Sequence, residues 1–395
     1  MKKQVKNNVH WVGKVDWDLR KFHGDELSTH KGSTYNSYLI QEKKTVLIDT
    51  VWTPYAKEFV DNLSKEVDLN KIDMIIMNHG EPDHSGALPA LMERIPETPI
   101  YCTANAVKSL QGQYHQEWNF NVVKTGDRIK IGNGKELIFV DMTMLHWPDS
   151  MATYLTDDNI LFSNDAFGQH LATERLFNDL VDQCELFHEA IKYFANILNP
   201  YTPRLRKKLQ EVNDLNLPID MIATSHGVIW REDPMQIVEL YAQWADDYQE
   251  DQITIVYDSM WNGTKMLAER IAEGIAAADE GVTVKVQNIA KSDVNDVITE
   301  VFKSKTVVVG SPTMSNNMLH SVAGFIHLMR TMKFKGKKAA AFGCYGWSGE
   351  SVKLIDASLN DAGFEVASKG FRNQWNPDED AENEAMEFGR MIAEL

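Results

Sequence analysis

The chain has 395 residues, of which 43% are hydrophobic and 25% are charged, a composition typical of folded proteins with sizeable cores. Its formal net charge of -17 argues against nucleic acid and anionic membranes as partners, because their phosphates would be repelled. The three cysteines, Cys102, Cys184 and Cys344, are too widely spaced to indicate a disulfide framework or a cysteine-based zinc site.

The N-terminal residues 1–8 carry lysines without a following apolar core, so they do not resemble a signal peptide. No apolar run approaches the roughly 18 residues that would span a bilayer. We therefore expect a soluble protein of the reducing cytoplasm.

The first half of the chain alternates short apolar runs with loops that are rich in His, Asp and Gly. Short apolar runs flanked by turn residues are typical of buried strands. Strands are expected at residues 45–49, 74–77 and 100–102, and helices at residues 54–67, 87–93 and 176–198. This pattern predicts sheets with helices packed on the outside.

Four potential metal ligands fall within six residues of the loop 78–86, directly after an apolar run: His79, Glu81, Asp83 and His84. The Gly and Pro residues of this loop allow the chain to turn, so that all four side chains can point into one pocket. The alternative is a polar loop that only hydrogen-bonds to itself. The density of ligand types favours a metal site.

Three later loops contain matching ligand types, and each follows a short apolar segment. They contribute His146, Asp165 and His226. Each residue taken alone could be an ordinary turn residue, but the set provides nitrogen and oxygen donors for two ions. Zinc in such a site would favour hydrolysis and iron would permit redox chemistry, so the ligand types alone leave both open.

The order of these ligand types resembles the metallo-β-lactamase-fold domain of flavodiiron proteins. Hydrolytic members of that fold carry a second His where Glu81 stands, so the carboxylate favours iron. The resemblance implies an N-terminal αββα sandwich with two non-haem irons. By that resemblance His79, Glu81 and His146 would hold one iron, Asp83, His84 and His226 the other, and Asp165 would bridge them. His84 could instead turn away and leave its position to water.

The composition becomes polar and acidic around residues 246–251, which predicts two domains, residues 1–250 and residues 251–395. Strands are expected in the second domain at 253–257, 282–286, 306–309, 339–342 and 363–367. Helices are expected between and after them, at 264–277, 294–301, 322–331, 351–362 and 381–394. This alternation predicts a doubly wound parallel sheet with helices on both faces.

The loop 258–265 joins the first of these strands to a helix and offers backbone N–H groups and hydroxyls to a phosphate. It matches neither the ATPase phosphate loop nor the glycine motif of dinucleotide binders. It resembles the hydroxyl-rich phosphate loop of flavodoxins, although Trp261 replaces the usual small hydroxyl residue. The residues expected to bind FMN here are Ser259, Met260, Trp261, Asn262, Gly263 and Thr264.

Two further loops follow strands of the same predicted sheet. In a flavodoxin-like strand order 2-1-3-4-5, FMN binds at the carboxyl ends of the strands. The first loop offers groups to the polar edge of the flavin: Pro312, Thr313, Met314, Ser315 and Asn316. The second offers small and aromatic residues near the ring: Gly343, Tyr345, Gly346 and Trp347. The alternative for the aromatic residues is an ordinary surface turn.

The resemblance covers about residues 8–392 and implies a flavo-diiron oxidoreductase with FMN and two irons. Reduction of O₂ to two waters needs four electrons, which a reduced FMN and a diferrous pair supply together, and coupling of two NO to N₂O needs two. O₂, NO or both are expected substrates. Rubredoxin is the first candidate for the external electron donor, and a reduced deazaflavin or a flavin reductase is the alternative. Because no C-x-x-C pair follows the flavodoxin-like half, a fused rubredoxin is not expected.

In this family a head-to-tail dimer places the flavin of one subunit beside the irons of the other, so we expect a homodimer. His23 and Tyr193 resemble pocket residues that donate a hydrogen bond or admit protons, although each could be a packed side chain with a satisfied polar tip. His170 is expected to orient the Asp165 loop without binding metal. The alternative functions are a zinc hydrolase with a flavodoxin-like docking domain and a non-enzymatic FMN electron carrier.

Overall fold

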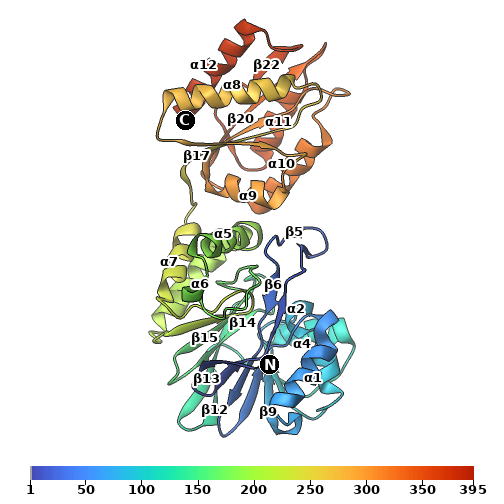
Figure 1. Cartoon of the computed structure of the whole chain (residues 1–395), viewed down its shortest axis with the longest axis vertical. Coiled ribbons are helices and arrows are strands. Elements are labelled where there is room, and N and C mark those ends of the chain that lie inside the picture. The colour runs from blue at the N-terminus through green and yellow to red at the C-terminus, as the bar shows by residue number, and fades with distance from the viewer. Residues whose placement is uncertain (1) are drawn as a thin grey trace. The chain divides into compact units, whose positions relative to one another are not determined.

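The computed structural model describes residues 2–395, which form two compact units (Figure 1). One unit contains the residues up to Tyr193 together with Tyr201–Gln243. The other contains Phe194–Pro200 and Trp244–Leu395. The limits predicted from composition, 1–250 and 251–395, stay predictions.

The first unit is built on two sheets. The order of the larger sheet is β1 (Lys3–Lys6), β2 (Val9–Trp11), β7 (Tyr38–Gln41), β8 (Thr45–Ile48), β9 (Ile72–Ile76), β10 (Ile100–Cys102) and β11 (Phe120–Val122). The order of the second is β12 (Arg128–Gly132), β13 (Lys135–Asp141), β14 (Met151–Leu155), β15 (Ile160–Asn164) and β16 (Met221–Thr224). Two short pairs accompany them, β3 (Lys14–Asp16) with β6 (Ser33–Tyr35) and β4 (Lys21–Phe22) with β5 (Leu27–Ser28).

Apolar side chains from both sheets form one core, in which Ile48 and Ile76 of the first sheet join Phe139, Phe162 and Ala223 of the second. Strands β14 and β15 are buried on both faces, because the sheet-to-sheet core covers one face and helices cover the other. Figure 1 shows α1 and α4 beside one sheet and α6 and α7 beside the other. The predicted αββα sandwich is therefore confirmed.

The helices of this unit lie between the strands in the chain. Their bounds are η1 (Thr53–Tyr55), α1 (Ala56–Glu66), η2 (Leu69–Lys71), α2 (Pro82–Ser85), α3 (Leu88–Met92), α4 (Ala104–Tyr114), η3 (Asn178–Leu180), α5 (Gln183–Tyr193), α6 (Thr202–Asp214) and α7 (Met235–Trp244). The last residue of α7, Trp244, and the first two residues of η5 (Asn199–Tyr201) belong to the other unit. The helix predicted from residue 176 begins only at Gln183. Before it, Phe177 forms a bridge to Ile229, and the Asn178 N–H donates to the Ile229 carbonyl, so this stretch is extended.

The second unit has a parallel sheet in the order β18 (Thr283–Asn288), β17 (Glu250–Tyr257), β19 (Ser304–Gly310), β20 (Lys338–Tyr345) and β21 (Glu365–Val366). Numbered along the chain, this is the flavodoxin-like order 2-1-3-4-5, so the predicted doubly wound sheet is confirmed. The helices are η4 (Phe194–Leu198), α8 (Gly263–Ala278), α9 (Val294–Lys303), α10 (His320–Met332), α11 (Ser351–Asp361) and α12 (Glu379–Ala393).

The fifth strand position is divided in two, which the sequence did not indicate. Strand β21 pairs with the start of β20, and a further strand, β22 (Phe371–Gln374), pairs with its end. The chain beyond β22 therefore reaches the carboxyl edge of the sheet, where the flavin loops lie. Among residues 2–395, no helix is long and apolar enough to cross a membrane.

Candidate metal centre and flavin pocket

The seven predicted metal ligands stand at the carboxyl ends of four strands. His79, Glu81, Asp83 and His84 follow β9, His146 follows β13, Asp165 follows β15 and His226 follows β16. Loops at strand ends can carry such ligands because the two packed sheets fix where each strand ends. Each of the seven side chains is at most 9% exposed, which is unusual for ionisable residues unless they are paired or hold a metal.

These side chains form two groups of three. The ligand atoms of His79, Glu81 and His146 all lie within 4.8 Å of one another, and the same holds for Asp83, His84 and His226. Three ligands in each group leave positions for water or substrate on a bound ion. The structure therefore brings together all of the residues that the sequence singled out as ligands.

Asp165 lies between the two groups. Its Oδ2 is 3.5 Å from the Nε2 atoms of both His79 and His146, whereas its Oδ1 is 3.1 Å from His84 Nε2 and 3.5 Å from His226 Nε2. Each carboxylate oxygen thus faces a different group. This is the geometry that a carboxylate shared by two cations requires.

The electrostatics of the cluster show how closely its charges interact. Burial alone would lower the pKa of His146 and His226, but hydrogen bonds to carboxylates outweigh it and raise these pKa values to about 9 and about 10. Burial opposes ionisation of Asp165, yet His84, His146 and His226 hold its pKa well below the usual range. Cations entering the cluster would replace the protons on these imidazoles.

Buried oxygen atoms support the fit to metal. Asp83 Oδ1 and Asp165 Oδ2 have no hydrogen-bond partner among the described residues. An unpaired buried carboxylate oxygen is costly, and a bound cation would satisfy it. The residues present therefore fit two metal ions with nitrogen and oxygen ligands.

Hydrogen bonds behind the cluster fix the orientation of two imidazoles. His79 Nδ1 lies 2.8 Å from Asp149 Oδ1, and His226 Nδ1 donates to the Thr34 carbonyl over 2.7 Å. Both contacts leave Nε2 facing the cluster. The sequence did not indicate a role for Asp149, because residues 79 and 149 meet only when the sheets pack.

The two predicted pocket residues also lie at the cluster. His23 Nε2 is 2.7 Å from Glu81 Oε1, and the Tyr193 hydroxyl donates to Asp165 Oδ1 over 3.3 Å. Burial raises the pKa of Tyr193 well above its usual value, so this hydroxyl stays protonated. His170 Nδ1 lies 2.9 Å from Ser33 Oγ, and its ring packs 5.1 Å from the Tyr193 ring.

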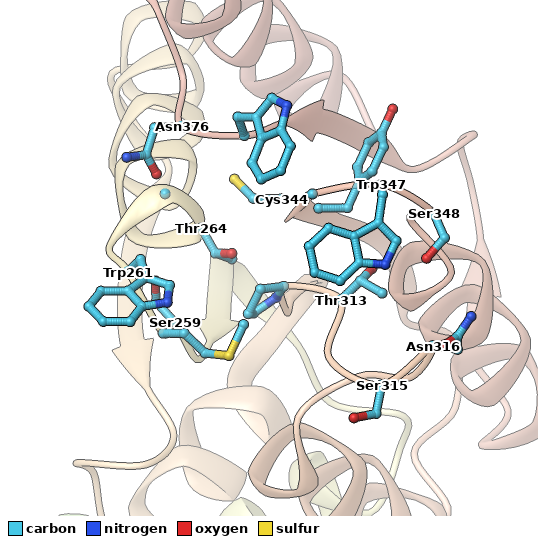
Figure 2. A pocket seen from close by; sticks show the side chains of 16 residues that line it. Ser259, Trp261, Thr264, Thr313, Ser315, Asn316, Cys344, Trp347, Ser348 and Asn376 are labelled. Atoms are coloured by element: carbon cyan, nitrogen blue, oxygen red, sulfur yellow. The ribbon is translucent and has the colours of Figure 1, made fainter.

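A cavity of about 700 Å³ lies at the carboxyl edge of the second sheet, between the three predicted flavin loops (Figure 2). Its lining includes these predicted residues: Ser259, Met260, Trp261, Gly263, Thr264, Pro312, Thr313, Ser315, Asn316, Tyr345, Gly346 and Trp347. Asn262, Met314 and Gly343 are predicted residues outside the lining. Four further residues complete it: Cys344, Ser348, Trp375 and Asn376.

One end of this cavity fits a phosphate. Within residues 2–395, Ser259 Oγ and Thr264 Oγ1 are buried atoms without a hydrogen-bond partner, and helix α8 begins between them at Gly263. A Cβ atom at Gly263 would lie 3.0 Å from both Asn376 Oδ1 and Cys344 Sγ, so glycine keeps this turn open. Free hydroxyls at a helix N-terminus are the donors that a phosphate group recognises.

The other end is aromatic. Trp347 and Trp375 are 84% and 61% exposed, and their ring centroids are 6.3 Å apart. Trp375 has a φ of +64°, which is rare for a bulky residue, and its N–H donates to the Tyr345 carbonyl over 2.7 Å. The ring packs on Gly346, where a Cβ atom would lie only 3.1 Å away. The sequence missed Trp375 because the fifth strand was expected to end at residue 367.

Comparison with known proteins agrees with both units. Residues 34–227 match the model of the ODP family beta lactamase, and residues 255–389 match that of flavodoxin. The chain is 58% identical over 390 residues to the anaerobic nitric oxide reductase flavorubredoxin of Escherichia coli O1:K1, a match that covers 98% of this chain and 81% of the relative.

Solved structures superpose over the whole chain. The rubredoxin oxygen:oxidoreductase of Desulfovibrio gigas gives a TM-score of 0.96 at 33% identity and covers 100% of this chain and 98% of its own. The flavodiiron protein of Giardia intestinalis gives 0.95 at 33% identity and covers 100% and 96%. The chain therefore belongs to the flavodiiron proteins, oxidoreductases that combine FMN with a non-haem diiron centre.

Proposed function

We propose that this protein reduces O₂, NO or both at two irons held by His79, Glu81, Asp83, His84, His146, Asp165 and His226. The observation that carries the proposal is the position of Asp165, whose two oxygens face two separate groups of ligands. The carboxylate Glu81, where hydrolytic members of the fold carry a second His, favours iron over zinc. The zinc-hydrolase and electron-carrier alternatives are not retained, because the chain belongs to a family of oxidoreductase enzymes.

When bound, FMN and the two irons would supply the redox chemistry, with electrons from an external donor such as rubredoxin entering through the flavin. The side chains of this protein hold the metal ligands in place and orient them. Asp149 and Thr34 fix the rings of His79 and His226, so their Nε2 atoms are already directed before an ion arrives. Such prior orientation lowers the cost of assembling the site.

Two further residues, Tyr193 and His23, contact carboxylates of the cluster. The Tyr193 hydroxyl stays protonated and is held at Asp165 Oδ1, so it is available as a hydrogen-bond donor. His23 Nε2 lies 2.7 Å from Glu81 Oε1, and its side chain is about one-third exposed to solvent. We propose that Tyr193 donates a hydrogen bond to the bound substrate and that His23 admits protons from water.

The rim of the flavin pocket has the apolar character of a protein-binding surface. Large apolar side chains gather at its mouth: Met260, Trp261, Trp347 and Trp375 line the pocket and are all exposed. Such a concentration on a highly charged protein marks a site of contact with another protein. We propose a head-to-tail homodimer in which this rim faces the metal centre of a second copy.

The names of the relatives support both substrates. The curated relative is a nitric oxide reductase, and the D. gigas relative is a rubredoxin oxygen:oxidoreductase. Purified protein should contain iron and FMN, and the anaerobically reduced sample should consume O₂, NO or both in stopped-flow measurements. Protein that contains zinc, lacks flavin and consumes neither gas would overturn the proposal.

A further inference from the structure

Helix α4 contacts both of the loops that supply the first ligand group of the metal centre. The loop 78–86 follows β9 and carries His79 and Glu81, and the loop 142–150 follows β13 and carries His146. The two loops are far apart in the chain, and each is hydrogen-bonded to a different end of the helix. This helix is therefore a common support for ligands that come from separate strands.

The C-terminal end of α4 holds the loop 78–86 through two side chains. Gln113 Nε2 donates to the Gly80 carbonyl over 2.5 Å. The Tyr114 hydroxyl lies 2.8 Å from Oγ of the fully buried Ser85. Ser85 Oγ is itself 2.9 Å from the carbonyl oxygens of both Gly80 and Glu81. Because carbonyl oxygens only accept, the Ser85 proton is directed at them, and Tyr114 is the donor to Ser85.

The N-terminal end of α4 holds the other loop. The Thr103 hydroxyl caps the helix by accepting a backbone N–H, and it donates to the Asp149 carbonyl over 3.0 Å. Asn105 Nδ2 donates to the Pro148 carbonyl over 3.1 Å. Both acceptors are backbone atoms, so these bonds fix the course of the chain directly after the ligand His146.

The helix and the two loops also meet at Gly80. A Cβ atom at this position would lie 2.9 Å from Ser109 Cβ on α4 and 2.6 Å from Asp149 Oδ2. The other oxygen of Asp149 faces His79 Nδ1 over 2.8 Å. Since there is no free space at this contact, a shift of the helix would move the loops that carry the ligands.

We propose that α4 sets the distance between the two loops of the first ligand group, with Tyr114 and Thr103 as positioning residues at its ends. A helix of 11 residues is about 16 Å long and keeps that length, so bonds at both ends fix the loops relative to each other. The inference rests on the proposed function, since it concerns the ligands that would hold the irons of that reaction.

The two ends of α4 differ in the ligand groups that depend on them. The Thr103 end holds the loop with His146, which belongs to the first group alone. The Tyr114 end holds the loop 78–86, which also carries Asp83 and His84 of the second group. Loss of a bond at the Thr103 end should therefore affect one iron, and loss at the Tyr114 end should affect both.

Iron occupancy at each ligand group tests the Thr103 end, measured by anomalous scattering from crystals equilibrated with limiting iron(II). Thr103→Val keeps the shape of the side chain and removes the hydroxyl. It should weaken iron binding by the first group about fivefold and leave the second group at the wild-type level. Thr103→Ser keeps the hydroxyl and should restore the occupancy. Asn105→Ala removes a bond to the same loop without removing the helix cap, and should act in the same direction.

The Tyr114 end is tested in solution by competition for iron(II) with a chelator of known affinity. Tyr114→Phe removes only the hydroxyl that donates to Ser85, and should weaken the binding of both irons about fivefold. Tyr101→Phe is the matched control, because Tyr101 is a half-buried residue of β10 whose hydroxyl makes no hydrogen bond within residues 2–395. FMN content should be the same in all of these variants.

The outcomes separate a positioning role from general support of the fold. Equal loss of iron from both groups in Thr103→Val, or a loss in Thr103→Ser as large as in Thr103→Val, contradicts the proposal. Iron binding by Tyr114→Phe that equals that of Tyr101→Phe also contradicts it. Wild-type protein that takes up no iron refutes the proposed function itself. Wild-type protein that binds iron and consumes gas, beside variants with unchanged occupancy, refutes the role of α4 alone.

Discussion

The metal centre and the flavin pocket differ in solvent exposure and in the kind of side chain that forms them. The metal centre is closed, and its seven ionisable side chains are buried and held by one another. The flavin pocket is open, and tryptophans that are more than 60% exposed stand at its mouth. Small cations need charged ligands shielded from water, whereas a flavin that exchanges electrons with a protein partner needs an accessible edge. The same chain therefore places its charges inside one unit and its aromatic surface outside the other.

Of the substitutions that test this difference, the largest loss of iron and activity is expected at Asp165. Asp165→Asn removes the charge that both ligand groups share, so iron per chain should fall at least about tenfold and gas consumption should fall on the order of 100-fold. FMN content should not change, because the flavin pocket belongs to the other unit. Metal analysis, the flavin absorbance and stopped-flow gas consumption measure the three quantities.

The control for this variant is Asp157→Asn, which changes an exposed carboxylate of the same unit. It should leave iron and turnover at the wild-type level. Equal loss of iron in both variants, or full iron retention in Asp165→Asn, would contradict the assignment of Asp165 as the shared ligand.

A smaller effect on iron binding is expected at Asp149, which contacts the ligand His79. Asp149→Asn keeps the shape of the side chain but removes the negative charge facing His79 Nδ1, so iron affinity should weaken by about tenfold. Competition with a chelator of known affinity measures it. Asp157→Asn, at an exposed position of the same unit, is a suitable comparison. Unchanged affinity in Asp149→Asn would show that packing alone orients the imidazole.

The flavin pocket should respond to loss of aromatic surface rather than of charge. Trp375→Ala removes one wall of the aromatic end and should weaken FMN binding to the apoprotein by up to about tenfold, with iron content unchanged. Gly346→Ala should have a similar effect, because the added Cβ would displace the Trp375 ring. Quenching of flavin fluorescence on titration measures both affinities.

Trp375→Phe keeps an aromatic ring and should retain most of the affinity, and Trp17→Ala removes an exposed tryptophan of the other unit. If Trp375→Ala binds FMN as tightly as these two controls do, Trp375 is a surface residue without a role in flavin binding.

The smallest expected effect is on the pH dependence of stability, through the buried Lys337 of the second unit. Burial lowers the pKa of Lys337 to about 7, although its Nζ donates to the carbonyls of Tyr248, Phe302 and Ser304. The unfolded chain, with an ordinary lysine pKa of about 10.4, binds more protons than the folded chain between these two values. The free energy of unfolding should therefore rise as the pH increases from about 7 towards about 10.

Urea titrations that follow FMN release, at pH 7 and at pH 9, measure this dependence in wild type and in Lys337→Met. The rise with pH should be smaller in Lys337→Met, whereas Lys335→Met, which changes an exposed lysine, should behave as wild type. An identical pH dependence in all three proteins would show that the three carbonyls keep Lys337 charged throughout.

Much of the fold followed from local patterns. The alternation of strands and helices after residue 250 predicted the doubly wound sheet, because apolar periodicity and turn residues act over a few positions. The helix expected from residue 176 begins later, because Phe177 forms a bridge to Ile229. The two residues are far apart in the chain, so a pattern of neighbouring residues cannot predict this pairing. The division of the fifth strand was missed for the same reason. Strand β22 pairs with β20, for example Gln374 with Tyr345, and these residues are far apart in the sequence.

The sequence by itself determined which side chains this protein has for its chemistry: four histidines and three carboxylates after strands, and a hydroxyl-rich loop before a helix. Only the tertiary structure decided that Asp165 stands between two ligand groups, that Asp149 supports His79, and that Trp375 lines the flavin pocket. Ligand type and periodicity are properties of neighbouring residues, whereas these distances arise when sheets and helices that are far apart in the chain pack together.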